Sequence, residues 1–191
     1  MHRSSLRSRS LVAGALALAA LVAACGGVSP AASALASSAG SSAGASAGAS
    51  AGVPMLDVRV GAPYSLADLP ASMADPIQAG IEKDLGVYGK AVHVSVREVQ
   101  QAGTSAAYLL VVAFPSGTLN DNIYGQVITD LSEGAESNFT PRLIGAVSVS
   151  FGTMSGGSVA VFRKGDLVLV TMSPASADLT PVVKALVGAN G

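Results

Sequence analysis

The chain of 191 residues contains one cysteine and two histidines, and it lacks several common site motifs. A single cysteine excludes an intramolecular disulfide, and so few cysteines and histidines exclude a metal site built from these ligands. No phosphate-binding loop, dinucleotide fingerprint or G-x-S-x-G motif occurs anywhere in the chain. We therefore expect no metal site, no cofactor-binding residues and no catalytic residues. An all-oxygen metal site is left open by these counts, but residues 120–122, NDN, lack the spaced ligands and the glycine of a calcium loop.

A transmembrane span is also disfavoured. The apolar run near the N-terminus, residues 11–24, has 14 residues, whereas a helix needs about 20 to cross a bilayer. Three arginines and no acidic residue precede this run, and small residues end it. A basic start, a short apolar stretch and a small-residue end are typical of a secretory signal peptide, which we assign to residues 1–24.

The end of this run carries the only cysteine. Residues 22–25 read VAAC, which resembles the lipobox of bacterial lipoproteins. The resemblance implies that the Cys25 thiol takes a diacylglyceryl group and that the chain is cleaved between Ala24 and Cys25. Cys25 would then be the new amino terminus, and two outcomes stay open there: a free amine or a second acylation. Two or three acyl chains anchor a protein stably, so the resemblance implies a position on the outer face of the cytoplasmic membrane.

Residues 25–53 consist of this cysteine and a segment that is nearly all Ala, Ser and Gly. Such a segment has too little apolar area to offset the entropy of ordering, so we expect a disordered linker. As a flexible coil its mean span is about 30 Å. The linker would act as a spacer between the membrane and a folded part.

The remaining segment, residues 54–191, has the length of one domain. Without residues 1–24 the chain keeps 8 of its 11 basic residues and all 12 acidic ones, which gives a formal charge of −4. This charge argues against nucleic acid or an anionic lipid surface as an electrostatic partner.

Three segments of this domain, 75–86, 118–131 and 178–187, have apolar residues at the spacing of amphipathic helices. We expect these side chains to face a sheet. They are Ile77, Ile81, Leu85, Ile123, Tyr124, Val127, Ile128, Leu131, Leu179, Val182, Val183 and Leu186.

The helix starts are predicted from capping residues. Asp75, Thr118 and Asp178 each precede a helical segment, and we expect them to be N-caps. Pro76 and Pro181 then fall in the first turn, where proline is tolerated.

The strand signals are clear in four places. Residues 91–99 and 146–151 alternate between apolar and polar side chains, as a strand with one exposed face does. Residues 106–114 are apolar on both faces and indicate a buried central strand. Residues 158–172 predict a hairpin whose turn contains Gly165, which can supply a positive φ.

Taken in order, these elements indicate the α+β class. The sequence predicts a single domain with an antiparallel sheet of about five strands and with the helices packed on one face. Residues 92–96 and 147–151 are alternating strands, and each precedes an apolar strand (108–114 and 166–172) and then an amphipathic helix, which suggests two β-β-α units.

The polar side chains suggest no site. His93 would be the only histidine left after cleavage, and we interpret it as a solvated residue on the polar face of a strand. Residues 155–157 are similar to the Ser-Gly-Gly around the nucleophile of some serine proteases, but a loop between two strands explains them better. The acidic residues on predicted polar faces are interpreted as solvated charges; they include Glu82, Asp84, Glu98 and Asp130.

These observations favour a lipid-anchored, non-enzymatic module of the cell envelope that binds or supports another envelope protein. An alternative is a carrier or sensor of an apolar ligand held between the sheet and its helices. An enzyme is the least favoured class.

Overall fold

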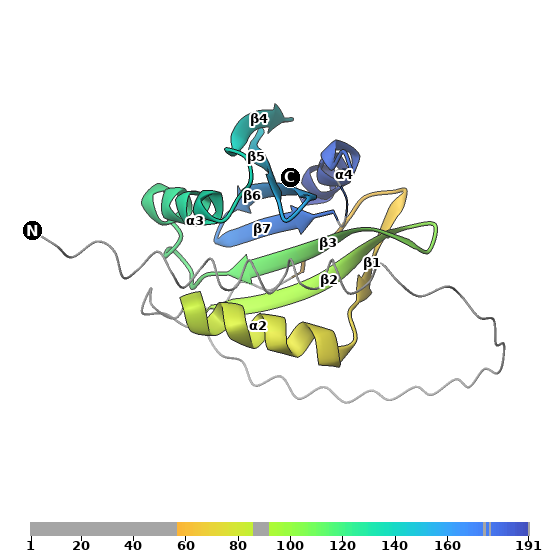
Figure 1. The fold of residues 1–191 in the computed structure, drawn as a ribbon, viewed down its shortest axis with the longest axis horizontal. Helices are drawn as coiled ribbons and strands as arrows, with labels where there is room; N and C mark the ends of the chain where they lie inside the picture. Colours follow the sequence, from red (N-terminus) through yellow and green to blue (C-terminus); the bar gives the residue numbers. More distant parts are fainter. Residues whose placement is uncertain (1–56, 86–91, 174, 176, 191) are drawn as a thin grey trace, which may run out of the picture.

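The computed structural model describes residues 57–85, 92–173, 175 and 177–190. In the order of the chain, the elements of this part are β1 (Tyr64–Asp68), α2 (Ala71–Leu85), β2 (His93–Gln101), β3 (Thr104–Ala113), α3 (Asp121–Glu133), β4 (Thr140–Ile144), β5 (Val147–Met154), β6 (Gly157–Lys164), β7 (Leu167–Met172) and α4 (Thr180–Asn190). The strands form one antiparallel sheet in the order β1-β2-β3-β7-β6-β5-β4 (Figure 1). The α+β class and the antiparallel sheet are confirmed, but the sheet has seven strands rather than about five.

The centre of the sheet is the pair β3 and β7. Leu109 lies opposite Thr171, and Leu110 lies opposite Val170. Every residue of β7 is buried, and so is β3 from Ala107 onward. The prediction of a buried central strand is confirmed, and its cause is that side chains on both faces of β3 are apolar.

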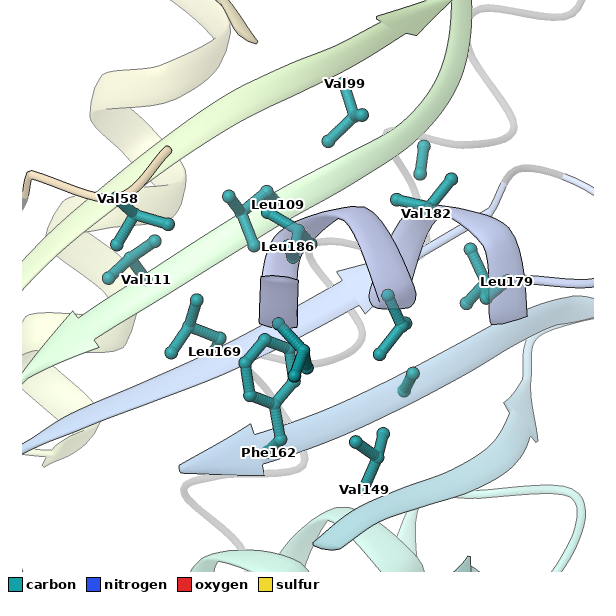
Figure 2. Close-up of a cluster of buried hydrophobic side chains, with 14 of the residues drawn as sticks. Val58, Val99, Leu109, Val111, Val149, Phe162, Leu169, Leu179, Val182 and Leu186 are labelled. Carbon is teal, nitrogen blue, oxygen red and sulfur yellow. The ribbon is translucent and has the colours of Figure 1, made fainter. Parts of the chain in front are cut away.

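The two faces of the sheet belong to two separate apolar clusters. On the first, the α2/α3 face, both of these helices pack on the sheet. This cluster contains Ile77, Ile81, Val92, Val94, Val96, Leu110, Val112, Phe114, Leu119, Val127, Met154, Val159, Val161, Val168, Val170 and Met172. On the second, the α4 face, α4 packs on Leu109, Phe162 and Leu169 among others (Figure 2). Figure 1 shows α3 and α4 on either side of β6 and β7.

The prediction that the helices pack on one face is therefore wrong. Strands β3 and β7 carry apolar side chains on both faces, so a single layer of helices would leave one face exposed to water. Helix α4 and the chain before β1 cover that second face, where Val58 is 3% exposed.

The second predicted β-β-α unit is wrong as drawn, because β6 lies between residues 147–151 of β5 and the strand β7, both in the chain and in the sheet. The β-β-α order occurs instead in β2-β3-α3 and β6-β7-α4. Their helices lie on opposite faces of the sheet. A two-fold axis perpendicular to the sheet would exchange the antiparallel strands β3 and β7 while leaving both helices on one face. The two units are therefore not related by such an axis.

The two strands that were not predicted are the edges, β1 and β4. Each has five residues, and neither has a residue pattern that alternates cleanly between buried and exposed positions. Four of the five residues of β4 are exposed. An edge strand pairs on one side only and needs little apolar area, so periodicity detects it poorly.

Two of the three predicted N-caps are wrong. Helix α2 begins at Ala71, where the carbonyl of Pro70 accepts from Met73 and Ala74, so Asp75 lies inside the helix. The residues before Asp75 are mostly good helix formers, and they extend the helix backwards.

At α3 the N-cap is Asn120 rather than Thr118, and its Oδ1 accepts from the N–H of Ile123 at 3.0 Å. Asp178 does serve the start of α4, since its Oδ1 accepts from the N–H of Thr180 at 2.9 Å. Pro181 is the second residue of α4, so its predicted place in the first turn is confirmed.

Tight turns join four pairs of neighbouring strands. In the β6-β7 turn Gly165 has φ +55°, which confirms the predicted role of this glycine. The β2-β3 turn has positive φ at Ala102 and Gly103, and the β5-β6 turn has it at Ser155 and Gly156. Two consecutive positive φ values are the requirement of a type I′ turn, which matches the twist of the strands it joins.

Candidate functional site

The predicted lipidation and cleavage residues, Cys25 and Ala24, lie outside the described residues, and so do the whole predicted signal peptide and the whole predicted linker. Within the described residues, none of the helices has the length and apolar character that a membrane span requires.

His93 is the first residue of β2 and is exposed. It lies opposite Ala113 at the end of the β2-β3 pair. Of its two neighbours on the same face, Arg97 pairs with Asp68 of β1 across 3.6 Å, and that carboxylate is exposed. Among the described residues no group of three His, Cys, Asp or Glu side chains is arranged to hold a metal ion.

Ser155 lies at the β5-β6 turn with φ +52°. The next residue, Gly156, donates its N–H to both carboxylate oxygens of Glu136, at 3.1 and 3.2 Å. The hydroxyl of Ser137, the residue after Glu136, accepts from the N–H of Thr153 at 2.9 Å. The loop after α3 is thus fastened to this turn. The interpretation of residues 155–157 as a connection between two strands is confirmed for Ser155 and Gly156, whereas Gly157 already begins β6.

The dispersed carboxylates differ in their surroundings. Asp130 of α3 is 5% exposed and accepts from Gln126 at 2.8 Å, so its interpretation as a solvated charge is wrong. It follows Val127 by three residues and therefore lies near the buried side of its helix. Glu98 is half-buried and accepts from Gln100 at 2.6 Å. The side chains of Glu82 and Asp84 lie outside the described ones.

A polar group surrounds the start of α3. Asp121 is in the first turn, where a negative charge complements the helix dipole, and it pairs with Arg163 of β6 at 2.8 Å. Tyr124 is half-buried, and its hydroxyl lies 3.5 Å from the carbonyl of Val161. Burial raises the pKa of Tyr124, and the charge of Arg163 opposes part of that rise. These contacts tie α3 to β6.

The free edge of the sheet at β4 is largely exposed, since four of its five residues are exposed. Leu143 is 76% exposed, and it is the one large hydrophobic side chain there that is largely exposed. On the other face of β4 the guanidinium of Arg142 lies 5.4 Å from the centre of the Phe151 ring. Pro141 lacks an N–H, and a proline in an edge strand limits further strand pairing.

The chain enters the domain along α4. We call residues 57–61 the strap. The N–H of Arg59 donates to Oδ1 of Asn190 at 3.1 Å, and Nδ2 of Asn190 donates to the carbonyl of Arg59 at 2.6 Å. Two residues on, the N–H of Gly61 donates to the carbonyl of Ala185 at 3.1 Å. The residue numbers rise along the strap as they fall along α4, so Asp57 lies toward the C-terminal end of that helix.

The opposite end of α4 faces β4. Asp178, just before the helix, interacts electrostatically with Arg142 of β4. The described chain therefore enters at one end of α4, and the exposed β4 edge lies near the other. A helix of 11 residues separates the two ends by about 16 Å.

The space between α4 and the sheet is filled by large side chains. Phe162 is 2% exposed, and Leu109, Leu169 and Leu186 are 0% exposed (Figure 2). Such a core is close-packed in the manner of protein interiors. The predicted alternative, an apolar ligand between sheet and helices, gains no support from this packing and stays a prediction.

In comparisons with known proteins, no family model, no curated protein and no solved structure matches the chain.

Proposed function

We propose that this chain is a bacterial lipoprotein, anchored at the outer face of the cytoplasmic membrane by acyl chains on Cys25. The folded domain would act there as a non-enzymatic binding or accessory module of the cell envelope. The observation that carries the proposal is the sequence VAAC at residues 22–25, preceded by a basic start and an apolar run.

The architecture of the domain is compatible with such tethering. The strap begins at Asp57, only a few residues after the predicted linker ends at residue 53, and its main chain is bonded to α4. The β4 edge lies near the other end of that helix. A linker with a span of about 30 Å would leave this edge accessible to other envelope proteins.

The anchor is tested with Cys25→Ser in a bacterial host that processes lipoproteins, with Ser29→Ala as a matched control in the same stretch. We expect the unaltered chain and the control to incorporate labelled fatty acid and to begin at residue 25, as read from the mass of the N-terminal peptide. Cys25→Ser should carry no label and should keep residues 1–24. An unlabelled parent chain, or an N-terminus elsewhere, would overturn the anchor.

The binding role is tested by cross-linking in intact cells, followed by capture from membranes in mild detergent. The control bait carries residues 1–56 fused to an unrelated globular protein, so that contacts made by the anchor and linker are subtracted. We expect one defined envelope protein to be enriched with the full chain and absent from the control. Equal recovery with both baits would refute a binding role for the domain.

A further inference from the structure

The main chain of Arg59 is fully engaged by one side chain. Oδ1 of Asn190 accepts from its N–H at 3.1 Å, and Nδ2 of Asn190 donates to its carbonyl at 2.6 Å. The second hydrogen on Nδ2 goes to the carbonyl of Leu186 at 2.7 Å, which fixes the amide in place. Asn190 is 7% exposed. The Asn190 side chain thus occupies both main-chain hydrogen-bonding groups of Arg59, as the backbone of a neighbouring strand would.

The side chain of Arg59 points the other way. It is 74% exposed and makes only a surface pair with Asp57, at 3.3 Å. On either side of it the strap is held down, by Val58 packed near Val111 (Figure 2) and by the bond from Gly61 to Ala185. Arg59 thus offers its charged group to solvent while its peptide groups are occupied.

Arg59 also has a special position in the sequence. It is the first basic residue after Arg9, and residues 10–58 contain no lysine or arginine. A protease that requires a basic side chain therefore finds no site in the linker and meets its first one in the strap. Such proteases bind their substrates as extended chains through main-chain hydrogen bonds, and the main chain of Arg59 is already bonded.

We propose that the Arg59–Val60 bond is a release site for trypsin-like proteases and that Asn190 controls access to it. While the amide holds the strap, the bond resists cleavage; when the strap lifts from α4, the bond enters the protease. Water then adds across the peptide bond and leaves a carboxylate on Arg59 and an amine on Val60. That the cut frees the domain from the membrane rests on the proposed function, because the fragment that ends at Arg59 would carry the anchor.

The test is digestion of the full chain, in membranes and in detergent, with trypsin under native conditions. Mass spectrometry measures the rate at which a fragment beginning at Val60 forms. Loss of the two bonds to Arg59 should raise the population of the open strap, and with it the cleavage rate in Asn190→Ala, by about 10- to 100-fold. Arg59→Gln should abolish this fragment.

Val127→Ala is the matched control, because Val127 is buried on the α2/α3 face, away from the strap. It destabilises the whole domain, and its rate of cleavage at Arg59 should stay near that of the parent chain. An equal rise in both variants would show that cleavage needs global unfolding and would overturn the proposal. So would an unchanged rate in Asn190→Ala, or no fragment beginning at Val60.

If Asn190→Ala does not fold, the urea dependence of cleavage in the parent chain tests the proposal on its own. Low urea should barely change the rate of cleavage at Arg59 if only the strap opens, and should raise it steeply if the whole domain must unfold. Release is scored separately, as the domain that appears in the supernatant of washed membranes. Cleavage without prior membrane association would refute the anchor and leave the gated site intact.

Discussion

Gly157, the first residue of β6, lies directly against the main-chain carbonyl oxygen of Ser173, just after β7. The N–H of Ser173 in turn donates to the carbonyl of Ser158 at 2.9 Å. The chain leaving β7 is therefore held against the start of β6 by backbone on both sides. No flexible side chain is present at this contact to make room for a larger residue.

Gly157→Ala is expected to destabilise the domain. Its Cβ would overlap the Ser173 carbonyl, and the backbone would have to shift, at a cost of about 1–3 kcal/mol. Urea unfolding followed by circular dichroism measures the change. Gly125→Ala is the control, because Gly125 is exposed in α3 with nothing within 4 Å of the added carbon. It should stabilise by about 0.5–1 kcal/mol. Changes of the same sign in both variants would contradict the argument.

Thr171→Val is expected to stabilise the domain. Thr171 of β7 is 0% exposed, and among the described residues its Oγ1 has no hydrogen-bond partner. A buried hydroxyl without a partner costs free energy, so a valine of similar shape should gain about 1 kcal/mol. Thermal unfolding provides the measurement. Thr129→Val is the matched control: its hydroxyl is exposed and donates to Gly125 at 2.9 Å, so no gain is expected. A loss of stability in Thr171→Val would show that the hydroxyl is satisfied.

The fold class was predictable because it depends on local patterns. The strict alternation of Val92, Val94 and Val96 marks one buried face, and the structure buries all three on the α2/α3 face. The residues that α4 buries, such as Val183 and Leu186, also follow from helical spacing. Burial of this kind needs only the period of the apolar residues.

The placement of α4 was harder to predict, because helical spacing says which side of a helix is buried but not against which face of a sheet. The signal was present in β3, whose apolar residues on both faces require cover on both. The contact of Asn190 with Arg59 could not have been predicted. This contact joins residues 131 positions apart, and no sequence pattern around either residue indicates which residue it contacts.

Ala102→Asn is expected to stabilise the β2-β3 hairpin. Ala102 has φ +51°, a conformation that costs most L-residues about 1–2 kcal/mol and that asparagine tolerates better. The change creates Asn-Gly, a preferred pair for this turn, and should gain about 0.5–1 kcal/mol in urea unfolding. Ala146→Asn, in the β4-β5 turn, is the control because positive φ there falls on Gly145 and not on Ala146. A gain at Ala146 as large as at Ala102 would show that the backbone conformation is not the cause.

Asp178→Ala is expected to lose stability in a pH-dependent way. Hydrogen bonds from the hydroxyl and the N–H of Thr180 hold the pKa of Asp178 below its usual value, and the charges of Arg142 and Lys184 act in the same direction. The unfolded chain therefore takes up a proton on this group at higher pH than the folded one. The stabilisation is present in full above the usual aspartate pKa of about 4, and it is lost as the pH falls through the lower, folded value.

The stability difference between the parent chain and Asp178→Ala should thus be constant from neutral pH to about pH 5 and shrink below about pH 4. Urea unfolding at a series of pH values, in low salt, measures it. Asp178→Asn is the control, since the amide oxygen can still accept from Thr180 but carries no titrating charge. The difference in the free energy of unfolding between Asp178→Asn and Asp178→Ala should not change with pH. If the curves of the parent chain and Asp178→Ala run parallel down to pH 3, the carboxylate is not the group that stabilises the start of α4.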